Sequence, residues 1–427
     1  MGSEMTDMGE LISDCVHCGF CLPSCPTYQL WGEEMDSPRG RIYLMKQLLE
    51  GEPLDATVVG HFDNCLGCMS CLTSCPSGVK YDALIETTRA QIEHEVERPK
   101  ADKALRSLIF SLFPYPRRLA AMRSPLRAYQ RSGLARLVRR SALTDRLPAA
   151  LGAMEELLPQ LGPMMRVPPI TPAIGEQRAR VGMLLGCVQR EFFPGVNVAT
   201  ARVLAAEGCE VIAPAGQACC GALSLHAGRE DEALRRAKRL IAVFESQAVD
   251  AIVINAAGCG SAMKDYGRLL ADDPAWAPRA AAFSAKCRDV SEMLTELGPV
   301  APRHPVPVVA AYHDACHLGH AQGIRSQPRE LLAGIPGLEV REIADADICC
   351  GSAGIYNLVK PEPARQLGDR KAANVLATGA ELLITANPGC LMQVDSALRR
   401  RGESIALAHT VEVLDASIRG VPLPATS

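Results

Sequence analysis

From residue 178 onward, short apolar runs alternate with longer amphipathic stretches. The apolar runs are Val181–Leu185, Val211–Ala213 and Ala251–Ile254, and the same order returns as Val308–Ala311, Val340–Ile343 and Leu382–Thr385. Helical stretches such as Glu230–Glu245 lie between them. Strands that alternate with helices usually form parallel sheets. This part of the chain therefore predicts two tandem α/β domains, at 178–300 and 301–427, with a proline-rich join between them.

The first 97 residues predict a small helical domain instead. Ser37 can cap a helix that starts at Pro38 and ends at Gly51. A second helix is expected from about Tyr81 to Glu97, ahead of Pro99. Together with the α/β domains, these elements predict an α+β fold.

Residues 98–147 concentrate positive charge. Thirteen lysines and arginines stand against Asp102 and Asp145, a net charge of +11, so the rest of the chain carries −14. An apolar cluster at Leu108–Phe113 interrupts the basic residues, which predicts basic amphipathic helices. We expect a helical connector and proline-rich linker at 98–177. Its basic face would meet an anionic membrane surface, the acidic remainder of the chain, or a partner subunit.

Composition narrows the classes of function. The 427 residues are 48% hydrophobic and 22% charged, and the net charge of −3 gives no indication of nucleic-acid binding. We see no secretory signal at the N-terminus, and no stretch approaches the roughly 18 apolar residues of a membrane-spanning helix. Eighteen cysteines in a chain expected to stay in the reducing cytoplasm favour metal ligation over disulfides.

Eight cysteines form two runs with the same spacing. The runs are Cys15, Cys18, Cys21 and Cys25, followed by Pro26, and Cys65, Cys68, Cys71 and Cys75, followed by Pro76. In such runs three cysteines wrap one iron–sulfur cube, and the fourth binds the other cube. The sequence therefore predicts two [4Fe-4S] clusters, one held by Cys15, Cys18, Cys21 and Cys75, the other by Cys65, Cys68, Cys71 and Cys25. Structural zinc prefers two separated pairs of ligands and does not fit this pattern.

Eight further cysteines form a second duplicated pattern. Offsets of 129 to 131 residues relate the first set, Cys187, Cys219, Cys220 and Cys259, to the second set, Cys316, Cys349, Cys350 and Cys390. The single cysteines follow predicted strands, and open parallel sheets bind ligands at that edge. Each set could hold a further iron–sulfur cluster or a zinc ion, and the alternative is buried apolar cysteine. We prefer that alternative for Cys209 and Cys287, which break the repeat.

Several other polar residues allow two interpretations. His313 and His317 flank Cys316 and could tune or ligate a metal, although a hydrogen-bonded structural histidine is more common. Arg39 and Arg41 could stabilise anionic clusters or belong to a solvated helix start. The chain shows no nucleotide-binding fingerprint and no catalytic triad or carboxylate pair, so its catalytic residues stay unknown.

With these motifs the chain resembles the cysteine-rich (CCG) domain family that includes heterodisulfide reductase, the anaerobic glycerol-3-phosphate dehydrogenase C subunit and lactate-utilisation proteins. The segments most similar to glycolate oxidase iron–sulfur subunits are Ser37-Pro-Arg-Gly-Arg-Ile-Tyr-Leu-Met-Lys-Gln-Leu-Leu-Glu-Gly51, Cys15-Val-His-Cys-Gly-Phe-Cys21 and Cys219-Cys-Gly-Ala-Leu223. One departure matters. Ala256 and Asn387 stand where heterodisulfide reductases have a fifth cysteine, so noncubane clusters and disulfide-reducing chemistry do not carry over.

The resemblance implies an electron-transfer subunit of a flavin-dependent complex that oxidises glycolate to glyoxylate without NAD. FAD would be bound by partner subunits only, and electrons would pass through the clusters to a quinone-type acceptor. We then expect a cytoplasmic protein, with peripheral contact to the inner face of the cell membrane through residues 98–147. The alternatives are the equivalent subunit of a lactate or glycerol-3-phosphate dehydrogenase, a thiol–disulfide reductase built on the CCG cysteines, and a redox-silent metal scaffold.

Overall fold

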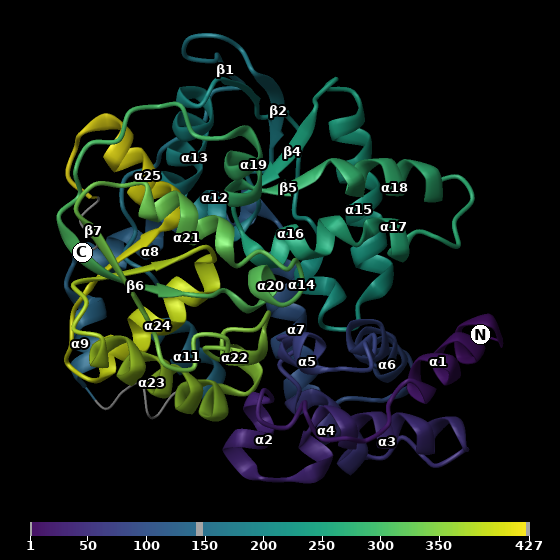
Figure 1. Ribbon diagram of the computed structural model, residues 1–427. Helices are drawn as coiled ribbons and strands as arrows, with labels where there is room; N and C mark the ends of the chain where they lie inside the picture. Colours follow the sequence, from purple (N-terminus) through teal and green to yellow (C-terminus); the bar gives the residue numbers. More distant parts are fainter. Residues whose placement is uncertain (1, 142–147, 424–427) are drawn as a thin grey trace.

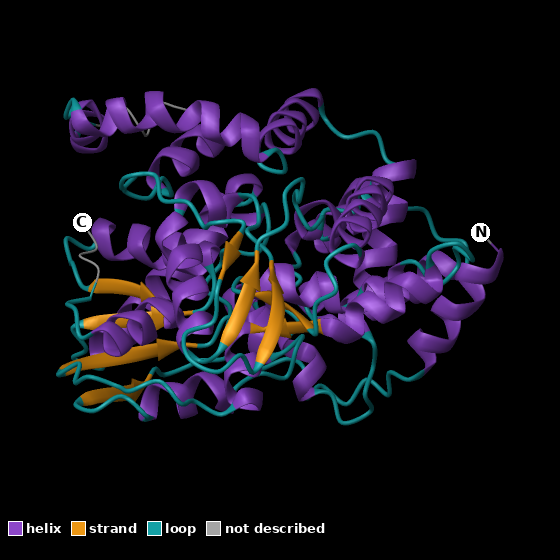
Figure 2. Cartoon of the chain, turned by 90° about the horizontal axis from the view of Figure 1, so that it is seen from above, coloured by secondary structure: helices purple, strands orange, loops and turns teal. Residues whose placement is uncertain are grey.

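Two parallel sheets organise the C-terminal part of the chain (Figures 1 and 2). The computed structural model describes residues 2–141 and 148–423. The first sheet has the order β1-β3-β2-β4-β5 and the second has the order β7-β6-β8-β9, with every neighbouring pair parallel except β1 and β3. The strands are β1 Ile170–Thr171, β2 Ala179–Met183, β3 Cys209–Ile212, β4 Ala251–Ile254, β5 Cys287–Asp289, β6 Val308–His313, β7 Leu338–Glu342, β8 Leu382–Thr385 and β9 Ala406–His409.

The second sheet repeats the first in register. Val181 on β2 pairs with Ala251 on β4, as Ala310 on β6 pairs with Leu382 on β8. The structure confirms the predicted α+β fold class and the predicted bounds of β4 and β8. The edge strands β5 and β9 were not predicted, since each is too short to give a periodic pattern.

Helices cover both sheets. In the first α/β domain they are α12 Val188–Phe192, α13 Pro194–Ala206, α14 Ala222–Leu225, α15 Glu230–Glu245, α16 Ala257–Lys264, α17 Tyr266–Leu269, α18 Ala277–Lys286 and α19 Val290–Leu297. In the second they are α20 Cys316–Gly319, α21 Ser326–Ala333, α22 Tyr356–Val359, α23 Pro361–Ala377, α24 Pro388–Arg400 and α25 Thr410–Arg419. The domains meet where α13 packs on α25 and α19 packs on α21, so one hydrophobic core spans both.

The N-terminal domain is helical, as expected. It comprises α1 Gly2–Ser13, α2 Pro26–Trp31, the short 3-10 helix η1 Glu34–Asp36, α3 Pro38–Leu49, α4 Ala56–Asn64, α5 Ser70–Ser74 and α6 Tyr81–Glu95. The Ser37 side chain accepts a hydrogen bond from the Gly40 amide, which confirms the predicted cap of α3. The helix α6 ends at Glu95, two residues before the expected position.

The basic connector packs against the rest of the chain. Its helices are α7 Lys100–Leu112, α8 Pro116–Arg131, α9 Leu134–Arg140 and α11 Ala149–Glu156, and residues 142–147 lie outside the described part. Ile109 and Phe110 are buried beside Ile355 and Leu358 of the second α/β domain. If residues 98–147 contact a membrane, Ile109 and Phe110 are not among the side chains that enter it, because the fold itself covers them. None of the helices in the described residues combines the length and apolar character needed to cross a bilayer.

Several connector arginines bond to other parts of the same chain, which is one of the three alternatives that the sequence left open for the basic segment. Arg98 forms ion pairs with Asp63 at 2.8 Å and with Glu93 at 3.0 Å. Arg123 is buried and donates hydrogen bonds to the backbone oxygens of Glu191 and Gly162. Part of the segregated charge is thus neutralised internally.

His409 links the two α/β domains and makes their contact sensitive to pH. Its Nε2 donates to the Asn255 carbonyl at 2.9 Å, and its Nδ1 accepts from the Val411 amide at 3.2 Å, which fixes the neutral ring. Burial lowers the pKa of His409 to about 4, below its ordinary value of about 6.5. Above pH 6.5 the ring is neutral in both the folded and the unfolded protein, so His409 does not change the free energy of unfolding with pH. Between pH 6.5 and 4 only the unfolded chain binds the proton, so the free energy of unfolding decreases as the pH falls.

We therefore expect acidification from pH 6.5 to 4 to lower the free energy of unfolding by about 3 kcal/mol through His409 alone. Urea unfolding at several pH values measures this decrease. The His409→Gln variant should be less stable at pH 7 but should lose less stability on acidification than the wild type. Parallel curves for the two proteins would show that His409 does not titrate in this range.

Candidate iron–sulfur and cysteine-rich sites

The first cysteine run surrounds a small cavity near the surface of the N-terminal domain. Cys15, Cys18 and Cys21 line it together with Cys71 and Cys75, which come from the second run. Cys18 is exposed, Cys71 is buried, and the other three are partly buried. The cavity therefore collects three thiols of one run and two of the other, and the four that the cross-ligation prediction assigns to one cluster are among them.

The second cysteine run lies deeper in the same domain. Cys65, Cys68 and Cys71 are buried, and so is Cys25 from the first run. Burial raises the pKa of the Cys71 thiol well above its ordinary value, and the neighbouring Cys68, Cys65 and Cys25 add to the shift. A thiol with such a pKa stays protonated at neutral pH. Iron would stabilise the thiolate there, because the metal ion replaces the proton on sulfur.

The two runs are related by an offset of fifty residues that extends to the backbone. His17 and Gly19 adopt positive φ angles of 51° and 86°, and their counterparts Gly67 and Met69 have φ angles of 65° and 64°. Left-handed residues at matching positions curl both loops in the same way. Ser24 and its counterpart Ser74 meet side chain to side chain at 2.6 Å, which joins the two halves of the domain.

Two arginines of α3 serve different loops. Arg39 donates to the His17 carbonyl at 3.2 Å, beside the first run. Arg41 is 1% exposed and pairs with Asp36 at 3.1 Å. Burial acts to raise the pKa of the Cys65 thiol, but the Arg41 guanidinium and a second arginine hold it below its ordinary value. Arg41 is therefore a buried cation beside the second run and does not belong to a solvated helix start.

We expect Arg41→Gln to destabilise the protein and to lower the potential of the buried cluster. Removing Arg41 leaves Asp36 buried without its charged partner, which typically costs about 3–5 kcal/mol. A missing cation also makes the reduced, more negative cluster less favourable. Urea unfolding and an EPR-monitored redox titration measure the two effects. Arg39→Gln is the matched control, because its ion pair with Glu34 is partly exposed and is worth about 1 kcal/mol or less.

The first CCG set gathers at the carboxyl end of the first sheet. Cys187 precedes α12, the Cys219–Cys220 pair precedes α14, and Cys259 lies in α16. The Sγ atoms of Cys187 and Cys219 are 3.6 Å apart. Hydrogen bonds from Cys187 and Cys220 hold the pKa of Cys219 well below its ordinary value. Gly221 has a φ of 90°, as the predicted tight turn requires.

The second CCG set occupies the same edge of the second sheet. Cys316 begins α20, the Cys349–Cys350 pair lies in the loop between β7 and α22, and Cys390 lies in α24. Hydrogen bonds from Cys349 and Cys390 hold the pKa of Cys350 well below its ordinary value. In each set, therefore, one thiol with a low pKa lies between two hydrogen-bonded neighbours, a donor set that fits a metal ion or an iron–sulfur cluster.

Both CCG sets open onto one cavity of about 480 Å³. All eight cysteines line it, and apolar side chains of the connector form another part of its lining, the apolar wall. The apolar wall comprises Ile109, Leu112, Phe113, Leu119, Met122, Leu126, Met154, Leu157 and Leu158. The volume is within the range of small-molecule sites, about 300–1,000 Å³. The inward-facing apolar cluster of the connector thus lines a cavity between the two thiol sets.

The buried ferredoxin loop contacts the second CCG set directly. The His317 Nε2 meets the Gly67 carbonyl at 2.8 Å, and the His320 Nδ1 meets the Thr73 hydroxyl at 2.7 Å. Cys68 packs in one cluster of side chains with Cys316 and Cys349. His317 is therefore a docking residue that fixes the second run against the second CCG set.

The structure also places the two remaining cysteines and the histidines near Cys316. Cys209 and Cys287 are fully buried in strands β3 and β5, within hydrophobic cores and outside both sets, as the apolar interpretation requires. The sequence favours a structural role for His313, yet its ring lies beside Cys350 and Cys390. The His-Asp-Ala-Cys-His sequence signalled a site, but the sequence alone could not show which histidine faces it.

Family models match each part of the chain. A model described as a 4Fe-4S dicluster domain matches residues 11–79, and one described as a cysteine-rich domain matches 181–264 and again 310–395. A model of the linker region of the glycolate oxidase iron–sulfur subunit matches residues 101–158. With the clustered thiols described above, these matches show that the chain carries iron–sulfur clusters.

Whole-chain relatives agree with the family models. The chain is 42% identical to the probable glycolate oxidase iron–sulfur subunit of Bacillus subtilis (strain 168) and 36% identical to the glycolate oxidase iron–sulfur subunit of Escherichia coli (strain K12). Each match covers 96% of this chain and 95% of the relative. The lactate utilization protein A of Exiguobacterium sp. is 34% identical over only 56% of this chain, although 98% of that protein is covered.

A solved structure supports the fold alone. A hypothetical protein from Helicobacter pylori matches with a TM-score of 0.56 at 10% identity, over 90% of this chain and 68% of that one. The family follows from the two relatives that are matched along nearly their whole length and from the three family models. The chain belongs to the family of glycolate oxidase iron–sulfur subunits.

Proposed function

We propose that the chain carries electrons from FAD on partner subunits of a glycolate-oxidising complex to a quinone-type acceptor. The observation that carries the proposal is the continuous series of thiol groups, from the exposed Cys18 through the buried Cys68 to Cys316 at the shared cavity. Flavins take two electrons from a hydroxy acid and release them one at a time, and an iron–sulfur cluster accepts one electron. In this proposal the eight ferredoxin cysteines bind two [4Fe-4S] clusters, and the two CCG sets bind further centres.

Electrons would enter at the exposed cluster loop. Val16 and Phe20 flank Cys18 and are 68% and 66% exposed. Apolar side chains exposed beside a redox centre suit a contact with another subunit, because apolar and aromatic side chains are common at the cores of protein interfaces. This loop supports the assignment of a flavoprotein partner to the N-terminal domain.

Electrons would leave at the cavity between the CCG sets. A quinone has an apolar ring and tail and two carbonyl oxygens that take up protons on reduction. The apolar connector wall suits the ring and tail, and His226, which also lines the cavity, supplies a polar group. In the alternative of a thiol–disulfide reductase, the same CCG thiols would themselves reduce a disulfide substrate.

Steady-state assays with the isolated chain and with the assembled complex test this function. The isolated chain should not oxidise glycolate, and the complex should reduce a soluble quinone with glycolate and without NAD. Parallel assays with lactate and glycerol 3-phosphate identify the substrate. Glycolate oxidation by the isolated chain, or faster turnover of another hydroxy acid by the complex, would contradict the proposal.

The connector still offers an exposed basic surface for contact with an anionic membrane. Arg117, Arg118, Arg131 and Arg136 are exposed, and so are Leu134 and Leu137 of α9. Each basic side chain near such a surface contributes about 1 kcal/mol. We expect flotation with anionic vesicles that salt reverses and that replacement of the four arginines by glutamine abolishes. Equal flotation with neutral vesicles, or none, would remove the membrane role, and Arg229→Gln outside the connector is a control.

A further inference from the structure

The two CCG sets are duplicated, but their surroundings differ. Val181 and Ala310 are equivalent positions, because each pairs with the first residue of the next strand in its sheet. Leu184 and His313 each lie three residues further along and are therefore aligned. The same alignment relates β4 to β8 and the residues that follow them. Beside the first set the aligned residues are Leu184, Ile254 and Ala256, and beside the second set they are His313, Thr385 and Asn387. The second set therefore has polar side chains where the first has apolar ones.

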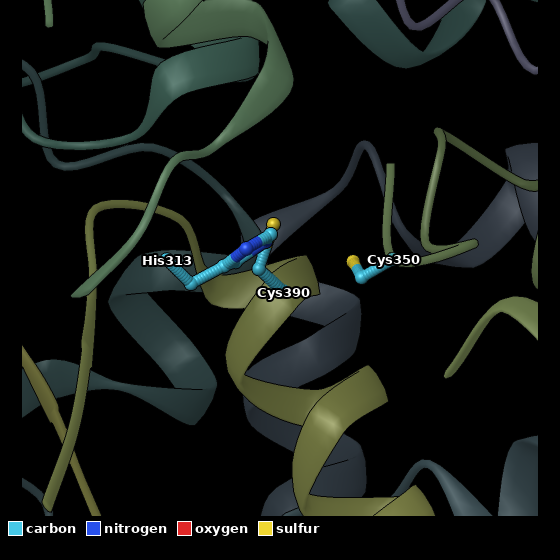
Figure 3. A group of neighbouring side chains, drawn as sticks. All are labelled: His313, Cys350 and Cys390. Carbon is cyan, nitrogen blue, oxygen red and sulfur yellow. The ribbon is translucent and has the colours of Figure 1, made fainter. Parts of the chain in front are cut away.

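His313 is aimed at the thiols of the second set (Figure 3). It is the last residue of β6 and is 1% exposed. A ring nitrogen of His313 and the Sγ atoms of Cys350 and Cys390 all lie within 4.8 Å of one another. Among the described residues, neither ring nitrogen has a nitrogen or oxygen atom as its hydrogen-bond partner, and the polar group that His313 does reach is the Cys350 thiol. A buried ring without such partners is costly. A histidine that only supported the fold would be expected to have such a partner.

We propose that His313 is a protein ligand of the metal centre at the second CCG set. The proposal rests on the proposed iron–sulfur function of that set and adds a donor to it. An imidazole nitrogen at the position of His313 completes a mixed histidine and cysteine site, whereas the first set offers thiolates beside Leu184. Binding iron through one nitrogen satisfies the buried ring, and Asn387, whose Nδ2 lies 3.5 Å from the Cys390 Sγ, can support a thiolate ligand.

This difference makes the two centres chemically distinct. With His313 the second set offers five donors, so the imidazole can take the place of one of the four thiolates on a four-iron cluster. A neutral imidazole in that place lowers the negative charge of the cluster, and histidine ligation raises the potential of iron–sulfur centres. The centre with His313 would hold electrons more tightly than the centre of the first set. The shared cavity would then lie between a centre of higher potential and a centre of lower potential.

Pulsed EPR of the reduced complex, with and without ¹⁵N-labelled histidine, tests the ligation. We expect a strong nitrogen coupling that responds to the label in the wild-type protein and is lost in His313→Leu. The leucine variant should fold, because Leu184 occupies the same position in the first domain. His313→Cys should retain iron without the nitrogen coupling and should show a lower potential. His409→Gln is the control, because His409 is buried but bonds to the Asn255 carbonyl.

The outcomes separate this inference from the proposed function. If Cys350→Ala lowers the iron content while His313→Leu keeps the strong nitrogen coupling, the second set holds a cluster and His313 is not its ligand. A weak coupling typical of a hydrogen bond to sulfur would also overturn the ligation. If Cys350→Ala leaves the iron content unchanged, or if zinc occupies the second set, both the inference and the proposed redox role of that set are wrong.

Discussion

Cys25→Ser should remove the buried [4Fe-4S] cluster and leave the exposed one in place. Cys25 is the last cysteine of the first run but is buried beside Cys65, Cys68 and Cys71 of the second. Loss of one of four thiolates should release the cube, so iron should fall by about four atoms per chain. Electron flow to the acceptor should stop, because the buried cluster lies between the exposed loop and the second CCG set.

Cys75→Ser is the matched variant for this experiment. It should damage the cluster of Cys15, Cys18 and Cys21 and spare the buried one. EPR distinguishes the two clusters, since a soluble paramagnetic reagent should relax the signal near the exposed Cys18 more strongly. Damage to the cluster of the same run in either variant would refute the crossed assignment.

Cys220→Ala and Cys350→Ala should each stop electron transfer to the acceptor and lower the metal content. Each residue lies in one CCG set, and both line the shared cavity. Because the ferredoxin cysteines are untouched, the [4Fe-4S] clusters should still be reduced by the flavoprotein partner. Metal analysis, EPR of the reduced complex and quinone reduction measure the three properties separately.

Cys209→Ala and Cys287→Ala are controls for the loss of a buried thiol. Both cysteines are fully buried in strands and lie outside the two sets, so both variants should keep their metal and their electron transfer. Full metal content and activity in Cys220→Ala and Cys350→Ala would mean that the CCG cysteines are only core residues.

The strands and helices that could be predicted from the sequence are those with a clear run or periodicity of apolar residues. The bounds of β4, β8 and α15 agree with the expected residues, because each element is flanked by clear breaks in hydrophobicity. The edge strand β5 consists of Cys287, Arg288 and Asp289, and only its place beside β4 makes it a strand. Local pattern cannot supply that information.

Cysteine spacing predicted which thiols gather, but their surroundings depend on tertiary packing. The sequence could not show that Ile109 and Phe110 turn inward, because an apolar helix face suits a membrane and a domain interface equally well. Which of three nearby histidines would face the thiols was equally hidden. His317 bonds to the Gly67 carbonyl and His320 to the Thr73 hydroxyl. Of the three, His313, at the end of β6, is the one directed at Cys350 and Cys390.

The central claim is that electrons from glycolate pass through this chain. The most direct test is to mix the anaerobic complex with glycolate, without an acceptor, and to record EPR spectra of rapidly frozen samples. We expect reduced iron–sulfur signals that disappear when a quinone is added. If glycolate reduces the flavin but the clusters of this chain stay oxidised, or if quinone leaves them reduced, the account is contradicted.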